Sequence, residues 1–134
     1  MKTYNIYNNN IKDLGNFSDN RGTIYDVFFD ISIYHVTMIY SEKNTIRGNH
    51  YHKKTTQHIL ILSGQLEYWY KKNNSDEKSN CYLAKQGDVI TSEPGEIHAM
   101  KTSENSCCFL VFTEGIRGGH NYECDTFRVD SIIE

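Results

Sequence analysis

Two histidines separated by one residue, His50 and His52, have the residue type and the spacing that suit a reactive site. They lie in an extended stretch, and alternate residues of a strand point to the same face with Cα atoms roughly 6.5 Å apart. An imidazole titrates near neutrality, so it can accept and return a proton, and its neutral nitrogen is a common metal ligand. The pair therefore predicts either an acid–base site or a metal site.

Two further residues complete the predicted site. Gln57 follows His52 by five positions, beyond the Lys-rich corner 53–56, and can face the same interior from the next strand. His98 comes much later, after a turn that contains Pro94 and Gly95. Three imidazoles and an amide oxygen could hold Zn, Fe, Mn or Ni. The metal interpretation uses His50, His52, Gln57 and His98.

The elements that must position these residues are short strands. Tyr, Phe, Ile, Val and Thr recur in short runs bounded by turn formers, and no stretch of ten or more residues has a convincing helical period. Gly64 permits a tight turn between two of the strands. We expect strands over residues 3–7, 23–29, 32–40, 45–52, 57–63, 65–71, 80–84, 89–92, 97–102, 107–113 and 126–133. Many short strands with regularly spaced turns predict an all-β jelly roll.

The composition limits the class of protein. A chain of 134 residues can bury a core, so we assign residues 1–134 to a single domain. The net charge is −3 and no block of Lys and Arg occurs, which disfavours nucleic acid as a partner. We find no signal-peptide stretch and no membrane-spanning segment. The four cysteines lack CxxC spacing, so we expect reduced thiols in a cytoplasmic protein.

The spacing of His50, His52 and Gly64 resembles the first motif of the cupin family. That motif places Gly, His-x-His, Glu and Gly at fixed intervals. This chain departs from it at two positions, because Asn44 replaces the first Gly and Gln57 replaces Glu. The loss of the Glu puts a tightly held metal in doubt.

The second cupin motif is matched by Gly87, Gly95 and His98. Glu93 stands at the Pro position of that motif, with Pro94 one step late, and Thr102 replaces its Asn. The resemblance covers about residues 23–113. It implies a single cupin domain, a double-stranded β-helix barrel, with an N-terminal strand and a C-terminal extension around that core.

Residues 47–51, Arg-Gly-Asn-His-Tyr, narrow the resemblance. They are similar to the Arg-Gly-x-His-Tyr of dTDP-4-dehydrorhamnose 3,5-epimerases, and residues 19–22 resemble the Asp-x-Arg-Gly of the same enzymes. The run Arg-Gly-x-His-x-His followed by Gln57 resembles dTDP-4-keto-6-deoxyhexose 3,4-ketoisomerases more closely. The resemblance implies a ketoisomerase or epimerase that acts on a nucleotide-linked keto sugar in surface polysaccharide synthesis.

The same resemblance implies roles for individual residues. His50 would be the base that removes the hydrogen beside the keto group, and His52 its partner or a second proton shuttle. Arg47 would bind the diphosphate, but Arg47 and His50 share a face only if Gly48 forms a bulge. Tyr68 and Tyr70 share one strand face, where they would stack on a base or sugar, act as an acid, or pack in the barrel core or an interface. The substrate-binding candidates are Arg47, Gln57, Tyr68, Tyr70 and His98.

Two other functions would use the same residues. One is a metal-dependent cupin enzyme, such as a dioxygenase, a lyase or a sugar-phosphate isomerase, and the other is a non-catalytic carbohydrate-binding cupin. Gln57 in place of Glu removes an anion and weakens the attraction for a divalent ion, so the leading interpretation requires no cofactor. The partners it implies are a small nucleotide sugar and a second copy of the chain, because such cupins commonly form homodimers.

Overall fold

A computed structural model of the chain describes residues 1–8, 11 and 13–134. Within these residues the fold consists of eleven strands and one short 3₁₀ helix, η1 (Gly119–Asn121). The strands are β1 (Lys2–Asn5), β2 (Asn16–Asp19), β3 (Gly22–Tyr25), β4 (His35–Ser41), β5 (Ile46–Tyr51), β6 (Thr56–Lys72), β7 (Asn80–Lys85), β8 (Asp88–Ser92), β9 (Glu96–Lys101), β10 (Cys107–Glu114) and β11 (Phe127–Arg128). The prediction of an all-β fold is confirmed. No described helix is long and apolar enough to cross a membrane.

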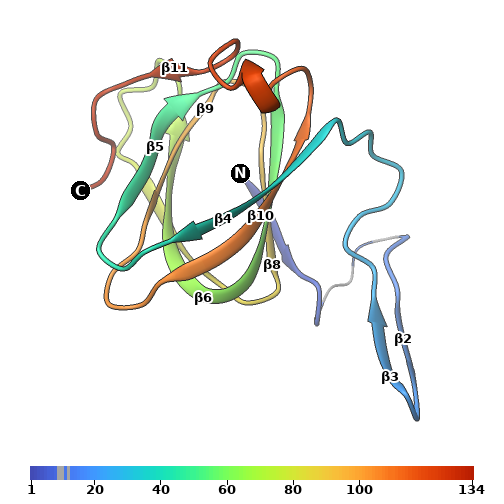
Figure 1. The fold of residues 1–134 in the computed structure, drawn as a ribbon. Coiled ribbons are helices and arrows are strands. Elements are labelled where there is room, and N and C mark those ends of the chain that lie inside the picture. Colours follow the sequence, from blue (N-terminus) through green and yellow to red (C-terminus); the bar gives the residue numbers. More distant parts are fainter. Residues whose placement is uncertain (9–10, 12) are drawn as a thin grey trace.

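The longest strand, β6, belongs to both sides of a jelly-roll barrel (Figure 1). Its first half pairs with β8 and β10, and its second half pairs with β7 and β9. β1 and β4 extend the first side, and β5 and β11 extend the second. All these pairings between described strands are antiparallel, and β1, β4, β7 and β11 each pair with one strand only.

Gly64 lies where β6 passes from one side of the barrel to the other. The sequence predicts a turn here between two strands, but β6 continues without a break from Thr56 to Lys72. Gly64 has a φ of +76°, and a Cβ at this position would lie 2.1 Å from the carbonyl oxygen of Ser106. Only glycine accepts both the dihedral angle and the close approach. The glycine therefore bends the strand instead of ending it.

The core is filled by side chains that alternate along the strands. In β10, Cys107, Phe109, Val111 and Thr113 are buried, and the residues between them are only half-buried. This period of two is the pattern expected of a strand with one face on a core. The main apolar cluster consists of Ile59, Ile61, Leu66, Tyr68, Ala84, Ile90, Met100, Cys107, Phe109 and Val111.

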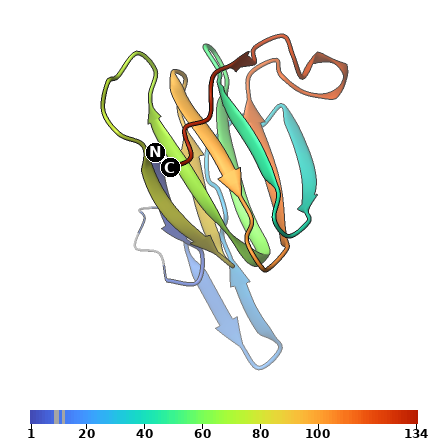
Figure 2. The ribbon, with the colours of Figure 1, turned by 90° about the vertical axis from the view of Figure 1, so that its left-hand side faces the viewer.

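Two regions differ from the predicted strands. Near the N-terminus, β2 and β3 form a hairpin that projects from the barrel (Figures 1 and 2), whereas the sequence predicts one strand over 23–29. The side chains of β2 are exposed throughout, so no burial pattern marks it. At the other end, the strand predicted over 126–133 is reduced to Phe127–Arg128. Beyond it, the amides of Val129 and Ile132 donate to Asn49, so single contacts rather than a ladder hold the tail.

Candidate active site

Three histidines meet inside the barrel. His50 lies on β5, His52 directly follows that strand, and His98 lies on the neighbouring strand β9. One ring nitrogen of each lies within 4.8 Å of the others. The structure thus brings together three side chains that the sequence places up to forty-eight positions apart.

Hydrogen bonds fix which nitrogen carries the proton in two of these rings. His52 Nδ1 lies 2.7 Å from the backbone oxygen of Asp125, and His98 Nδ1 lies 3.3 Å from that of Glu96. A carbonyl oxygen only accepts, so both Nδ1 atoms are protonated and both Nε2 atoms carry a lone pair. These two Nε2 atoms are buried and make no well-formed hydrogen bond with the described residues. Such bare nitrogens suit a base or a metal ligand.

Burial keeps all three imidazoles neutral. Burial, followed by the repulsion of His52, lowers the pKa of His50 from 6.5 to about 3. Burial is also the main cause that lowers the pKa of His52 and that of His98. Gln57 is buried close to His52, where its side chain weakly opposes the shift. Removing charge from water disfavours the imidazolium, so the cluster is a set of neutral nitrogens at physiological pH.

A cavity of about 330 Å³ opens onto one member of this cluster. His50 and Gln57 line it from the barrel. Arg117, Tyr122 and Arg128 line it from the C-terminal segment. The neutral imidazole is thus placed at the wall of a cavity that also carries cationic side chains.

Arg47 lines the same cavity because β5 contains a bulge. The pairing of β5 with β9 shifts between Gly48 and His50, and Gly48 has a φ of +91° and Asn49 a φ of +55°. A Cβ at Gly48 would lie 2.7 Å from the backbone oxygen of His98. The bulge breaks the alternation of the strand, which satisfies the condition for Arg47 and His50 to share a face. Arg47 Nε donates to Ser41 Oγ at 2.8 Å.

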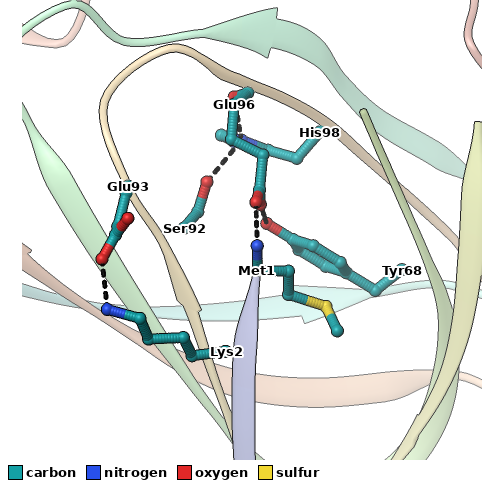
Figure 3. A network of polar contacts seen from close by, with 7 residues as sticks. All are labelled: Met1, Lys2, Tyr68, Ser92, Glu93, Glu96 and His98. Atoms are coloured by element: carbon teal, nitrogen blue, oxygen red, sulfur yellow. Dashed lines mark hydrogen bonds and ion pairs between the residues drawn. The ribbon is translucent and has the colours of Figure 1, made fainter. Parts of the chain in front are cut away.

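The two tyrosine candidates lie away from this cavity. Tyr68 is completely buried in the core, with its ring stacked 6.0 Å from that of His98 (Figure 3). Its hydroxyl donates to Glu96 Oε1 at 3.5 Å, and burial strongly raises its pKa. Tyr70 lines a different hollow, which also includes Met1 and Glu96. Of the alternatives open from the sequence, the structure places Tyr68 in the barrel core.

Figure 3 also shows what holds His98 from behind. Ser92 Oγ lies 3.2 Å from His98 Nδ1, and the Glu96 carboxylate accepts from the amine of Met1. Burial raises the pKa of Glu96, and the amine opposes that shift. His98 is thus fixed in the barrel wall and not exposed to the cavity, since its exposed fraction is zero.

Sequence reasoning did not find the cationic residues of the C-terminal segment. Arg117 is half-buried, and its Nε donates to the backbone oxygen of Tyr122 and to Thr126 Oγ1 at 3.0 and 2.9 Å. Burial lowers the pKa of Arg117. Arg128 makes two hydrogen bonds to Glu123, of 2.7 and 2.9 Å. The strand expected over 126–133 did not indicate that Arg128 lines a cavity, and no motif pointed to Arg117.

A jelly-roll barrel that carries histidines from neighbouring strands to one interior site defines the cupin class. More narrowly, the chain belongs to the family described as the polysaccharide biosynthesis C-terminal domain, whose sequence model matches residues 17–127. A search of curated protein sequences gave no match. The resemblance inferred from the two histidine motifs is confirmed.

Solved structures of sugar-modifying enzymes share this fold. A 3,4-ketoisomerase from Helicobacter canadensis has a TM-score of 0.73 and 17% identity, over 96% of this chain and 90% of that one. The dTDP-4-dehydrorhamnose 3,5-epimerase from Sulfolobus tokodaii has a TM-score of 0.71 and 18% identity, over 89% and 76% of the two chains. The ketoisomerase QdtA from Thermoanaerobacterium thermosaccharolyticum, solved with TDP, has a TM-score of 0.69 and 20% identity, over 87% and 84%. At such identities the likeness establishes the fold.

Proposed function

We propose that this protein is a ketoisomerase or epimerase of a nucleotide-linked 4-keto-6-deoxy sugar, and that His50 and His52 carry the acid–base chemistry. The observation that carries the proposal is the position of neutral His50 in a cavity that Arg47, Arg117 and Arg128 also line. A proton acceptor beside three cations fits a substrate that is both acidic at carbon and anionic. The family and the shared fold support the same class of substrate.

The chemistry requires few groups. A 4-keto group acidifies the hydrogen on C3, and His50 accepts that proton as the C3–H bond breaks and its electron pair forms a C3–C4 double bond. Gln57 donates to the oxygen on C4, where negative charge develops. For isomerisation His52 acts as the second shuttle, which takes the 3-hydroxyl proton and returns a proton to O4. The imidazolium of His50 gives its proton to C4, so that the product has a keto group at C3 and a hydroxyl at C4. Return of a proton to the opposite face of C3 gives the epimer instead.

Binding of the substrate would raise the pKa of His50, which acts as the base. Burial and the nearby arginines lower the pKa of free His50, which makes it a weak acceptor. A diphosphate bound by Arg47, Arg117 and Arg128 would cancel their charge and favour the imidazolium. Guanidinium groups bind phosphate oxygens in pairs, so the same contacts would orient the sugar.

Isotope exchange tests this proposal. The protein is incubated in D₂O with dTDP-4-keto-6-deoxyglucose, and the sugar is followed by proton NMR. Deuterium at C3 or C5, or formation of the 3-keto sugar, is the expected result. Binding without any exchange would overturn the enzymatic proposal and favour a carbohydrate-binding cupin.

The bare nitrogens of His52 and His98 favour a second candidate, a metal-dependent cupin enzyme. Their buried Nε2 lone pairs and the ring of His50 form a donor set that fits Zn, Fe, Mn or Ni. His50, His52 and His98 would hold the ion, with Gln57 nearby as a neutral oxygen donor. A bound ion would act as a Lewis acid that stabilises the enolate oxygen.

Metal analysis separates the two candidates. The purified protein and its His98→Ala variant are compared for metal content and for turnover before and after chelation. Stoichiometric metal that is lost in the variant, together with loss of turnover on chelation, would overturn the metal-free mechanism. Full turnover by the chelated protein supports it.

We also propose that the protein acts as a homodimer. Apolar side chains are exposed on the hairpin, where Phe17 and Ile24 are each 65% exposed, and on β4, where Met38 is 67% exposed. Exposed apolar patches mark protein–protein contacts. Light scattering coupled to size exclusion measures the mass, and a purely monomeric protein would contradict this proposal.

A further inference from the structure

We propose that Asp125 is a positioning residue for His52, and that it acts by holding both the imidazole and the turn that follows it. Asp125 lies in the C-terminal segment, seventy-three positions from His52. Neither cupin motif contains it, and it was not among the residues predicted from the sequence. Its relevance to turnover rests on the proposed function, but its effect on His52 does not.

The first contact involves the backbone of Asp125. Its carbonyl oxygen accepts the Nδ1 hydrogen of His52 at 2.7 Å. Both groups are buried, with exposed fractions of 2% for His52 and 4% for Asp125. This hydrogen bond selects the tautomer in which Nε2 carries the lone pair, and that atom is buried without a well-formed hydrogen bond to the described residues.

The second set of contacts involves the carboxylate. Oδ1 accepts from the amide of Lys53 at 2.9 Å, and Oδ2 accepts from the amides of Lys54 and Thr55 at 3.0 and 2.8 Å. The carboxylate thus accepts hydrogen bonds from three consecutive backbone amides, which are strong contacts for an anion.

These contacts act on one small unit of chain. The turn begins directly after His52. Asp125 therefore binds the imidazole and the three amides of the turn together. On the other side, the amide of Gly95 donates to the backbone oxygen of His52 at 2.7 Å. If the carboxylate is lost, the turn and the carbonyl of Asp125 can move apart. His52 then loses the acceptor that selects its tautomer, although no atom of the ring has been changed.

The carboxylate can be weakened without removing the residue. Asp125→Asn keeps one acceptor oxygen but places an NH₂ group against backbone donors, and Asp125→Ala removes all three contacts. The matched control is Asp130→Asn, which makes the same change at an exposed carboxylate of the same segment. Circular dichroism establishes that each variant folds. If Asp125→Ala does not fold, Asp125→Asn decides.

The first readout is the tautomer of His52, measured in chelated protein by long-range ¹H–¹⁵N NMR, with the signal assigned from its loss in His52→Gln. The wild type and Asp130→Asn are expected to show protonated Nδ1 and bare Nε2. Asp125→Asn is expected to show a mixture of the two tautomers. A wild type with protonated Nε2, or an Asp125→Asn variant with the wild-type tautomer, would overturn the proposal.

The second readout separates this proposal from the proposed function. If the wild type turns over the keto sugar, Asp125→Asn is expected to lower kcat by about 10–100-fold with little change in KM, as for other groups that orient a functional histidine. An unchanged kcat would overturn the positioning role and leave the isomerase proposal intact. If the wild type turns over nothing, the isomerase proposal fails, and the tautomer measurement alone decides the role of Asp125.

Discussion

His50 lies directly opposite His98 in the β5–β9 ladder, and their ring centroids are 4.7 Å apart. The pairing depends on the bulge at Gly48, which resets the register before His50. His98 is completely buried, whereas His50 reaches the cavity. The ring of His50 is therefore available to a ligand in the cavity, and the ring of His98 packs behind it.

Replacement of His50 should remove catalysis without unfolding the barrel. We expect His50→Asn to lower kcat by about 10²–10⁴-fold, which is the usual contribution of one general base. His50 is only partly buried, so the fold should tolerate the change. The measurement is turnover of the keto sugar by NMR. His120→Gln, at an exposed histidine, is the control, and comparable rates in the two variants would contradict the prediction.

Arg117 should contribute to substrate binding through the guanidinium nitrogens that its Nε contacts leave available. We expect Arg117→Gln to raise KM at least about tenfold, because a hydrogen bond to a charged group is worth about 1.5–3 kcal/mol. The effect should weaken at high salt, since the attraction is partly screened. Steady-state kinetics at two salt concentrations measure this. Lys78→Gln, in an exposed loop, should change neither parameter, and an unchanged KM in Arg117→Gln would count against the arginine cluster.

The positions of His50, His52 and His98 could be predicted from the sequence because local spacing and turn rules govern them. The spacing placed His50 and His52 on alternate positions at one strand end, and the turn around Gly95 placed His98 beside them. Asn44 replaces a motif glycine, yet it has a φ of +58°, a conformation that Asn tolerates better than most residues. The departure from the motif is therefore conservative in backbone geometry.

The rest of the site depends on long-range contacts that no local pattern encodes. Arg117 and Arg128 reach the cavity from a segment with little regular structure, which is fixed by hydrogen bonds to its own backbone and to the barrel. Tyr68 and Tyr70 share a strand face, as expected, but that face turns from the main core to a separate hollow along β6. Periodicity predicts which face of the strand a side chain occupies. It does not predict whether that face contacts the core or a cavity.

Gly64, the one glycine of β6, should tolerate substitution poorly. We expect Gly64→Ala to lower the free energy of unfolding by more than Gly95→Ala, which provides the control. Both residues have positive φ, which costs an alanine about 1–2 kcal/mol. Only Gly64 also has a backbone atom, Ser106 O, 2.1 Å from the added Cβ, whereas nothing lies within 4 Å at Gly95. Urea unfolding measures both, and equal losses would contradict the prediction.

Acid should destabilise the chelated protein because its buried histidines resist protonation. Burial lowers the pKa of His50 from 6.5 to about 3, and it also lowers the pKa values of His52 and His98. Between about pH 3 and pH 6.5 the unfolded chain binds more protons than the folded one. The free energy of unfolding therefore increases with pH in this window, by up to about 1.4 kcal/mol per pH unit for each neutral histidine.

The dependence on pH is measured by urea unfolding above and below pH 6.5, the ordinary pKa of histidine. His50→Asn removes one of the groups whose pKa burial lowers in the folded state, so its stability should depend less steeply on pH than that of the wild type. His120→Gln removes an exposed histidine and should keep the wild-type slope. If all three proteins lose the same stability on acidification, other groups cause the loss, and the neutral cluster does not explain it.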